Sequence, residues 1–192
     1  MASTLSSLQM GTHMARFSRD DAALTASYFA TDATSFVDRA DLDELKRVAI
    51  AESGPARYSL HESPASTLHS MVILQPFGTY AQPRKHLTKA KLFHIVDGEM
   101  AVVIFEEDGS VRAVHHMGAD HVLIVHVESD CYHTNIALTP QAVYHEVITG
   151  PFDRGSADRV FASFAPSDTE QEKGLAYVRA SIASVRSDMA VN

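Results

Sequence analysis

The sequence contains no tryptophan and only one cysteine, Cys131, among its 192 residues. A single cysteine excludes an internal disulfide framework and predicts a reducing, cytoplasmic location. Basic residues are also few, because 16 Lys and Arg stand against 24 Asp and Glu and give a net charge of -8 with histidine neutral. Such a surface repels nucleic-acid phosphates and anionic lipids, so we expect no nucleic acid and no membrane as partner.

Long apolar runs are missing as well, and no stretch approaches the ~18 apolar residues of a membrane helix. Met1–Met14 is rich in Ser and Thr and lacks the apolar segment of a secretory signal. The rest of the chain, with 45% hydrophobic and 21% charged residues, has the composition of a globular domain. We expect a partly flexible N-terminal tail over residues 1–35, one domain over 36–168, and a helical extension over 169–192.

Three segments carry the spacing of helices. Residues 20–30 (DDAALTASYFA) predict a short helix. A second helix is expected over residues 42–52, with Asp41 at the N-cap and Glu44 three positions later as a capping box. Apolar residues at helical spacing predict a third helix over residues 169–186.

Most of the remaining chain has the pattern of short strands separated by turns. The strongest hairpin signal is Asp108-Gly109 between two apolar runs. Many short strands with turns between them are typical of an all-β sandwich or barrel. The expected strand segments are YSLHES, TLHSMVILQPF, KLFHIVDG, MAVVIFEED, VRAVHHM, HVLIVHV, HTNIALT and AVYHEVITG.

One spacing is more specific. Jelly-roll cupins carry a first motif of Gly, five residues, His, one residue, His, four residues, Glu, six residues and Gly. This chain keeps every interval from Gly78 to Gly98, but it places Arg84 at the first His, His86 at the second His and Lys91 at the Glu.

The second cupin motif carries a single His ligand, usually after a Pro and a Gly. The segment from Glu128 to His133 keeps that His, with Glu128 in place of the Pro and Asp130 in place of the Gly. Both motifs are therefore recognisable, although the metal ligands of the first motif are largely replaced.

The chain resembles the WbuC family of cupins, within the RmlC-like superfamily, from about Phe36 to Asp168. The motifs that carry the resemblance are Arg57–His61, Gly78-Thr79-Tyr80, Pro83–His86, Leu92-Phe93 with Gly98, Tyr132-His133-Thr134 and Glu146 with Gly150-Pro151-Phe152. The resemblance implies a mainly β fold, a cupin jelly-roll β-barrel with an N-terminal helix and a C-terminal helix. The family name is linked to bacterial surface-polysaccharide clusters, which implies a sugar-related ligand.

The replaced ligands argue against a metal in the barrel. Arginine has no lone pair to donate, and lysine could coordinate only after losing its proton. We therefore expect no cofactor, with a divalent metal at His86 and His133 only if other residues complete the site. The residues considered for that role are Gln82, Asn135 and His61.

The cations instead predict a small anionic or carbohydrate-derived ligand in the barrel. Arg84 offers a planar fork suited to a carboxylate or phosphate. The expected ligand-binding residues are Arg84, Lys91, Gln82, Asn135 and Glu146. An internal ion pair is the alternative, because a buried cation needs a partner and Glu146, Glu128 or Asp130 could supply it.

Two other functions stay open. A metal-independent sugar-nucleotide epimerase or isomerase would use His86 or His133 as base, Tyr80 or Tyr132 as acid and Glu146 to orient the base. In that reaction Arg84 and Lys91 would stabilise an enolate-like intermediate or hold a phosphate. A non-catalytic role in oligomerisation is the other, and we expect a homodimer in any case.

The remaining histidines are assigned no chemistry. His94 lies three residues after Lys91 and therefore on the opposite face of its strand. His115, His116, His121 and His126 are interpreted as surface or satisfied core residues. Nothing in the sequence near Cys131 marks it as a nucleophile.

Overall fold

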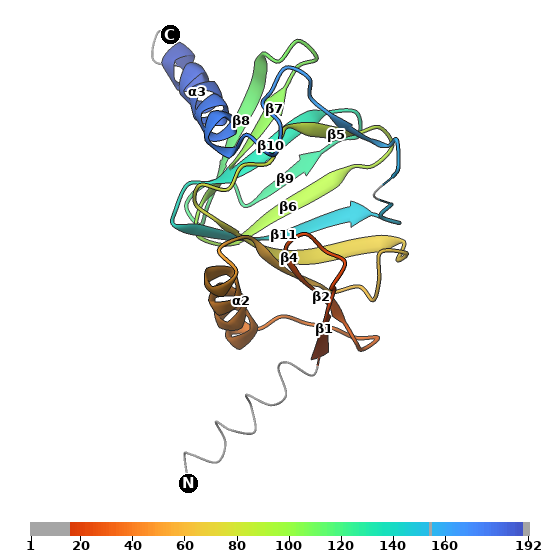
Figure 1. The fold of residues 1–192 in the computed structure, drawn as a ribbon. Helices are drawn as coiled ribbons and strands as arrows, with labels where there is room; N and C mark the ends of the chain where they lie inside the picture. The colour runs from red at the N-terminus through yellow and green to blue at the C-terminus, as the bar shows by residue number, and fades with distance from the viewer. Residues whose placement is uncertain (1–15, 154, 190–192) are drawn as a thin grey trace.

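The computed structural model describes residues 16–153 and 155–189, and it places twelve strands in two sheets (Figure 1). The tail expected over Met1–Met14 lies outside the described residues. The larger sheet has the strand order β1-β2-β3-β4-β11-β6-β9, and the smaller has the order β12-β5-β10-β7-β8. These sheets, with one helix before and one after the main run of strands, confirm the predicted mainly β jelly-roll fold.

The strands of the larger sheet are β1 (Phe17–Arg19), β2 (Ala26–Ala30), β3 (Ala56–Ser59), β4 (Leu68–Pro76), β11 (Gln141–Thr149), β6 (Lys91–Asp97) and β9 (Ile124–Val127). Those of the smaller sheet are β12 (Arg159–Phe161), β5 (Arg84–His86), β10 (Tyr132–Ala137), β7 (Met100–Phe105) and β8 (Val111–Met117). Strands β5 and β12 have three residues each, too few for a period to be visible in the sequence. All eight strand segments expected from the sequence overlap a strand of the structure. The overlap is shortest for YSLHES, which shares only Tyr58 and Ser59 with the end of β3.

The prediction of a helix over residues 20–30 is wrong. Residues 26–30 form β2, which pairs in parallel with β3 from Ala26 opposite Ala56 to Phe29 opposite Ser59. Strand β1 then pairs with β2, so part of the segment expected as a tail belongs to the larger sheet. Pairing with an existing strand therefore outweighs the local helical spacing.

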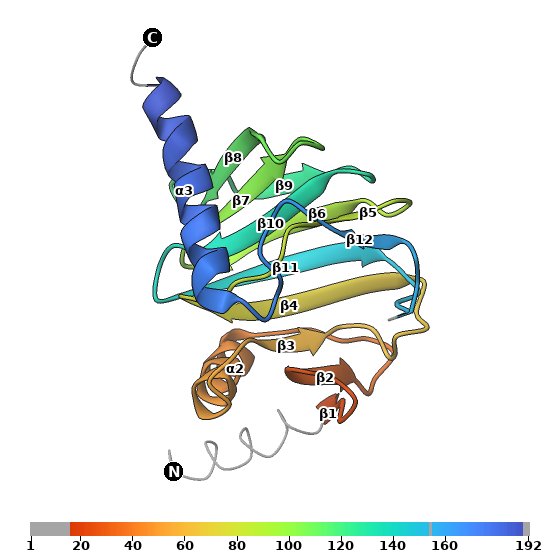
Figure 2. The same cartoon turned by 45° about the horizontal axis from the view of Figure 1, so that its top comes forward.

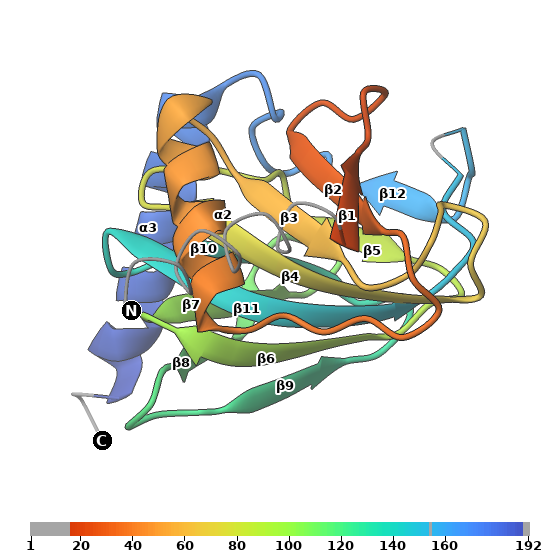
Figure 3. The same ribbon diagram turned by 90° about the horizontal axis from the view of Figure 1, so that it is seen from below.

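Helix α2 (Arg39–Ala51) starts three residues earlier than expected. Its N-cap is Asp38, whose carboxylate accepts from the Asp41 amide at 3.0 Å, while the Asp41 carboxylate accepts from the Asp38 amide at 2.8 Å. The capping box is thus Asp38 with Asp41, not Asp41 with Glu44. The helix packs against β3 and β4, as the view from below shows (Figure 3).

Helix α3 (Gln171–Met189) confirms the predicted C-terminal helix and lies beside β7 and β8 (Figure 2). Val178 and Ile182 pack there against Val103, Phe105 and other outward-facing residues of the smaller sheet. No described helix is both long and apolar enough to span a bilayer.

The interior between the sheets changes character along the barrel. At the end where β6 meets β7, Phe93, Ile95, Met100, Val102 and Met117 form an apolar core. At the other end, where β6 begins and β11 ends, polar and charged side chains surround a cavity. Apolar side chains therefore fill one end of the barrel, and the cavity with its polar and charged side chains lies at the other end.

Candidate functional site

A cavity of about 420 Å³ lies between the two sheets at the polar end of the barrel. Its wall is contributed by strands of both sheets and by the loop before β2. The charged and histidine residues in the wall are Asp20, Arg57, His61, His69, Arg84, His86, Lys91, Glu146 and Arg159. Tyr144 and several apolar residues complete it.

Cations outnumber anions in this wall. Arg57 comes from β3, Arg84 from β5, Lys91 from β6 and Arg159 from β12. Among the described residues, Glu146 and Asp20 are the acidic members of the lining. Strand pairing explains the gathering, because Arg84 and Arg159 lie on paired neighbouring strands of the smaller sheet and the larger sheet brings the other two.

Lys91 points into the barrel and forms an ion pair with Glu146. Its Nζ lies 3.3 Å from Oε1, and the two residues are only 5% and 8% exposed. Burial lowers the pKa of Lys91, and the Glu146 charge offsets this only in part. Burial alone would raise the pKa of Glu146, but Lys91 and Arg84 outweigh it and hold that pKa below its usual value. Of the candidate internal partners, Glu146 is therefore the one that pairs with Lys91.

Arg84 is different. It lies opposite His133 on β10 and Phe161 on β12, and its side chain lines the cavity while remaining half-buried. No described residue forms a hydrogen bond or an ion pair with its guanidinium. Glu128 and Asp130 do not fill that role, since Glu128 lies beside His126 and Asp130 pairs with Lys85. The planar fork of Arg84 is thus available to a ligand.

His86 lines the same cavity and is held by a carboxylate that the sequence did not indicate. Its Nδ1 lies 3.0 Å from Oδ2 of Asp158, and Thr88 donates two further hydrogen bonds to that carboxylate. Burial and the nearby Lys91 lower the pKa of His86. The imidazole is therefore oriented by Asp158 and favours its neutral form.

His133 is buried behind the cavity wall, with 4% exposure. Its Nδ1 donates to the Cys131 carbonyl at 2.9 Å, which assigns the lone pair to Nε2. No described residue forms a hydrogen bond with that Nε2. Burial, followed by the Lys91 charge, places the pKa of His133 well below its ordinary value. His133 is thus a neutral histidine, and it does not itself line the cavity.

The inherited metal positions do not fit a metal ion. His86 and His133 offer nitrogen donors, but Lys91 is engaged by Glu146 and Arg84 can only repel a cation. Gln82, one of the residues considered for completing the set, donates its side-chain amide to the Ala162 carbonyl. This donor set argues against a metal at the inherited position.

Several residues expected in the site have other contacts. The Tyr80 hydroxyl donates to the Pro166 carbonyl at 2.6 Å, and its ring packs against Gly174 of α3. Tyr132 faces the outside of the smaller sheet, where Lys85 lies over its ring. Asn135 does face the interior, but its amide donates to Gln75 at 2.5 Å and to the Tyr144 hydroxyl at 3.3 Å. Neither Tyr80 nor Tyr132 lines the cavity.

The structure adds residues that sequence reasoning missed or left aside. Arg57, Arg159, Asp158 and Tyr144 contribute to the site from segments far from either motif. His61 and His69 stack in the wall with ring centroids 4.1 Å apart. Burial, with His69 alongside, lowers the pKa of His61 to about 4. Alternation along β4 and β11 could have indicated the inward face of these strands, but not which residues meet across the barrel.

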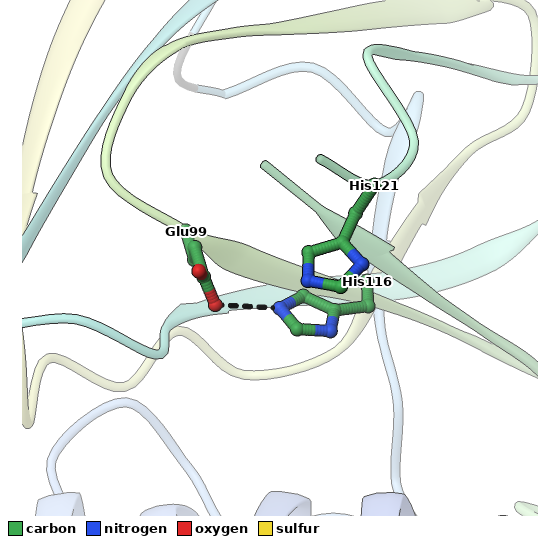
Figure 4. A group of neighbouring side chains, drawn as sticks. All are labelled: Glu99, His116 and His121. Carbon is green, nitrogen blue, oxygen red and sulfur yellow. Dashed lines mark hydrogen bonds and ion pairs between the residues drawn. The ribbon is translucent and has the colours of Figure 1, made fainter. Parts of the chain in front are cut away.

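A second group of candidate ligands lies outside the barrel cavity. Atoms of Glu99, His116 and His121 that could bind a metal all lie within 4.8 Å of one another (Figure 4). The expectation that the chain has no metal cofactor took no account of this group. The sequence does not reveal it because Glu99 precedes β7, His116 lies in β8 and His121 lies in the turn after β8, and strand pairing brings them together.

The chain matches one protein family over part of its length and several solved structures. A family described as a domain of unknown function (DUF6016) matches residues 37–117. No curated protein matches the sequence. Among solved structures, the capsular polysaccharide assembling protein CapF from Staphylococcus aureus is 17% identical with a TM-score of 0.49, covering 56% of this chain and 29% of that one. Oxalate decarboxylase from Bacillus subtilis is 20% identical with a TM-score of 0.44, covering 56% and 27%.

This chain therefore spans less than a third of the length of the structures it matches. At these TM-scores the similarity adds no argument, and the strand order of the chain itself establishes the fold. The resemblance to the WbuC family stays a prediction.

Proposed function

We propose that this chain is a WbuC-like cytoplasmic cupin that binds a small anionic ligand, such as a carboxylated or phosphorylated sugar, in the barrel cavity. The observation that carries the proposal is Arg84, a cavity-lining guanidinium to which no described residue is hydrogen-bonded or ion-paired. A half-buried arginine in a largely cationic wall is stabilised when an anion supplies the missing partner. Lys91 is already paired with Glu146, so it adds positive charge to the wall but is not the main residue that binds the ligand.

The size and lining of the cavity support a ligand of monosaccharide size. Pockets for small molecules typically enclose roughly 300–1,000 Å³, and this cavity of about 420 Å³ is near the lower end. Tyr144 and Ser59 add hydroxyl groups to the wall, and Phe29 and Met71 add apolar surface. Such a lining suits a sugar ring that carries one acidic group.

A thermal-shift panel tests this proposal. The panel pairs glucuronate with glucose and glucose 1-phosphate with glucose, so that each pair differs by the acidic group. We expect the charged member to raise the melting temperature of the wild type and to have little effect on Arg84→Gln. Arg112→Gln, which changes an exposed arginine outside the cavity, is the matched control. Equal shifts with charged and neutral members would contradict the proposal.

The His86–Asp158 pair favours one second candidate, a metal-independent epimerase or isomerase. An imidazole that is oriented by a carboxylate and neutral near pH 7 can accept a proton from a carbon acid in the cavity. Tyr144 would then take the place of Tyr80 or Tyr132 as the nearby hydroxyl, because it lines the cavity. Arg84 would stabilise the negative charge that develops on the substrate.

Hydrogen exchange with solvent tests this second candidate. Sugar nucleotides incubated with the protein in D₂O would gain deuterium at a carbon next to a carbonyl, as followed by NMR. We expect His86→Gln to abolish the exchange and Asp158→Asn to slow it. A wild-type protein that exchanges no carbon-bound hydrogen in any substrate with an acidic C–H would remove this candidate and leave binding alone.

A further inference from the structure

The group formed by Glu99, His116 and His121 lies at the end of the barrel opposite the anion cavity. Lys91, at the start of β6, lines the cavity, whereas Glu99 follows the far end of that strand. His116 is near the end of β8, and His121 lies in the turn that leads to β9. The two sites are thus separated by the length of β6, and nothing in the anion-binding proposal uses this group.

The three side chains converge because β7 pairs with β8, with Met100 opposite Met117 and Ala101 opposite His116. The Glu99 amide donates to Oγ1 of Thr139 at 2.9 Å, and the Leu138 amide donates to the Glu99 carbonyl at 2.9 Å. The turn after β8 is closed by the His121 amide on the Gly118 carbonyl and the Val122 amide on the His116 carbonyl, both at 3.1 Å. Backbone contacts therefore fix the positions from which the ligands project.

The side-chain geometry brings one carboxylate and two imidazoles to one point. Oε2 of Glu99 lies 2.8 Å from Nε2 of His116. The rings of His116 and His121 stack with centroids 3.8 Å apart, and Figure 4 shows the Glu99 carboxylate directed at the His116 ring.

We infer that Glu99, His116 and His121 bind a divalent transition-metal ion of the zinc type. Imidazole nitrogen and carboxylate oxygen are the ligands that such ions take. Ligand atoms bound at about 2.0–2.2 Å to one tetrahedral ion lie roughly 3.3–3.6 Å apart, so this group must close by about 1 Å. The exposed His121 ring can make that adjustment. The ion replaces the proton between Glu99 and His116, and water fills its remaining positions.

Such an ion would connect the turn between β6 and β7 to the turn between β8 and β9. Gly118 makes room for it, because a Cβ there would lie 3.0 Å from Cγ of Glu99 and 3.3 Å from Cδ2 of His121. A metal bound only to the folded chain stabilises it by a free energy that rises with the logarithm of the ratio of ion concentration to dissociation constant. The ion is therefore expected to be a structural link and not part of the barrel chemistry.

Calorimetric titration of ZnCl₂ into the full, untagged chain after chelator treatment tests the inference. We expect one ion per chain, a rise in melting temperature with added zinc, and at least a tenfold loss of affinity in His121→Gln. His126→Gln is the matched control, since His126 is also exposed beside a carboxylate but has no third ligand among the residues that the structure describes. Cobalt(II) added in place of zinc would show the visible absorption of a nitrogen- and oxygen-bound ion in the wild type.

Three outcomes would overturn the inference. They are no zinc binding by the wild type, unchanged binding in His121→Gln, and an equal loss of affinity in the His126→Gln control. Loss of binding in His86→Gln with His121→Gln unaffected would place the ion in the barrel and overturn it in the same way. Because His121 is exposed, its variant is expected to fold, and circular dichroism checks that it does.

Discussion

Lys91 and Glu146 form an ion pair inside the barrel, with Nζ 3.3 Å from Oε1 and both side chains almost fully buried. Lys91 stands at the position of the metal-binding Glu in the cupin motif, and Glu146 lies next to it in the barrel. Removing one member of a buried pair leaves the other without a countercharge. We therefore expect Glu146→Gln to lower the free energy of unfolding by about 3 kcal/mol, measured by urea denaturation.

Glu128→Gln is the matched control, because Glu128 is an exposed carboxylate with 76% side-chain exposure. Its substitution should change the free energy of unfolding by less than about 0.5 kcal/mol. Replacing both partners, as in Lys91→Met with Glu146→Leu, should recover most of the lost stability. Equal, small effects for Glu146→Gln and Glu128→Gln would show that the internal pair does not stabilise the barrel.

The lowered pKa of His61 predicts that the folded protein loses stability in acid. Burial lowers its pKa to about 4, below the value of about 6.5 expected for the unfolded chain. Between these two values the unfolded chain binds more protons than the folded one, so the free energy of unfolding falls as the pH drops from about 6.5 to 4. With solvent screening of this partly exposed ring taken into account, the effect is about 1 kcal/mol.

Unfolding measured across this pH range should show a flatter profile for His61→Gln than for the wild type. Burial also lowers the pKa of the neighbouring His69, so the double variant should be flatter still. The exposed His126→Gln serves as control. A wild-type profile parallel to that of His61→Gln would contradict the assigned role of burial.

Strand β9 is an edge of the larger sheet, and Leu123 just before it and Ile124 at its start are 51% and 54% exposed. An edge strand has backbone groups free to pair with another chain, and a two-fold dimer is the commonest way to cover it. We expect a homodimer that Leu123→Lys weakens, checked by sedimentation at several concentrations. A wild type that sediments as a monomer throughout would remove both this interface and the expected dimer.

The sequence predicted the mainly β fold class and one half of the cavity wall, but it predicted a helix over residues 20–30 where the structure has β2. The turns at Gly78, Gly98 and Gly109 all adopt positive φ, and the kept interval between Gly78 and Gly98 places Arg84, His86 and Lys91 on the wall of the cavity. Strand alternation also correctly assigned His94 to the outer face, where it is exposed. These features are local, so the spacing of the chain determines them.

The other half of the site depends on contacts that no local pattern records. Asp158 reaches His86 from a segment 72 residues later, and Arg57 and Arg159 enter the cavity from strands outside both motifs. Strand alternation predicted Gln82 on the same face as Arg84, but Gln82 and Tyr80 precede β5 and donate to the Ala162 and Pro166 carbonyls in the segment before α3. Glu99 and His116 meet only because β7 and β8 pair.

Isothermal titration calorimetry of glucose 1-phosphate, with glucose as the uncharged reference, tests the central claim most directly. We predict that the wild type binds the phosphate form with at least tenfold higher affinity than glucose. We further predict that Arg84→Gln removes the difference while Arg112→Gln keeps it. Binding of both sugars with equal affinity, or a preference for the phosphate that survives in Arg84→Gln, would contradict the account of an anion site built on Arg84.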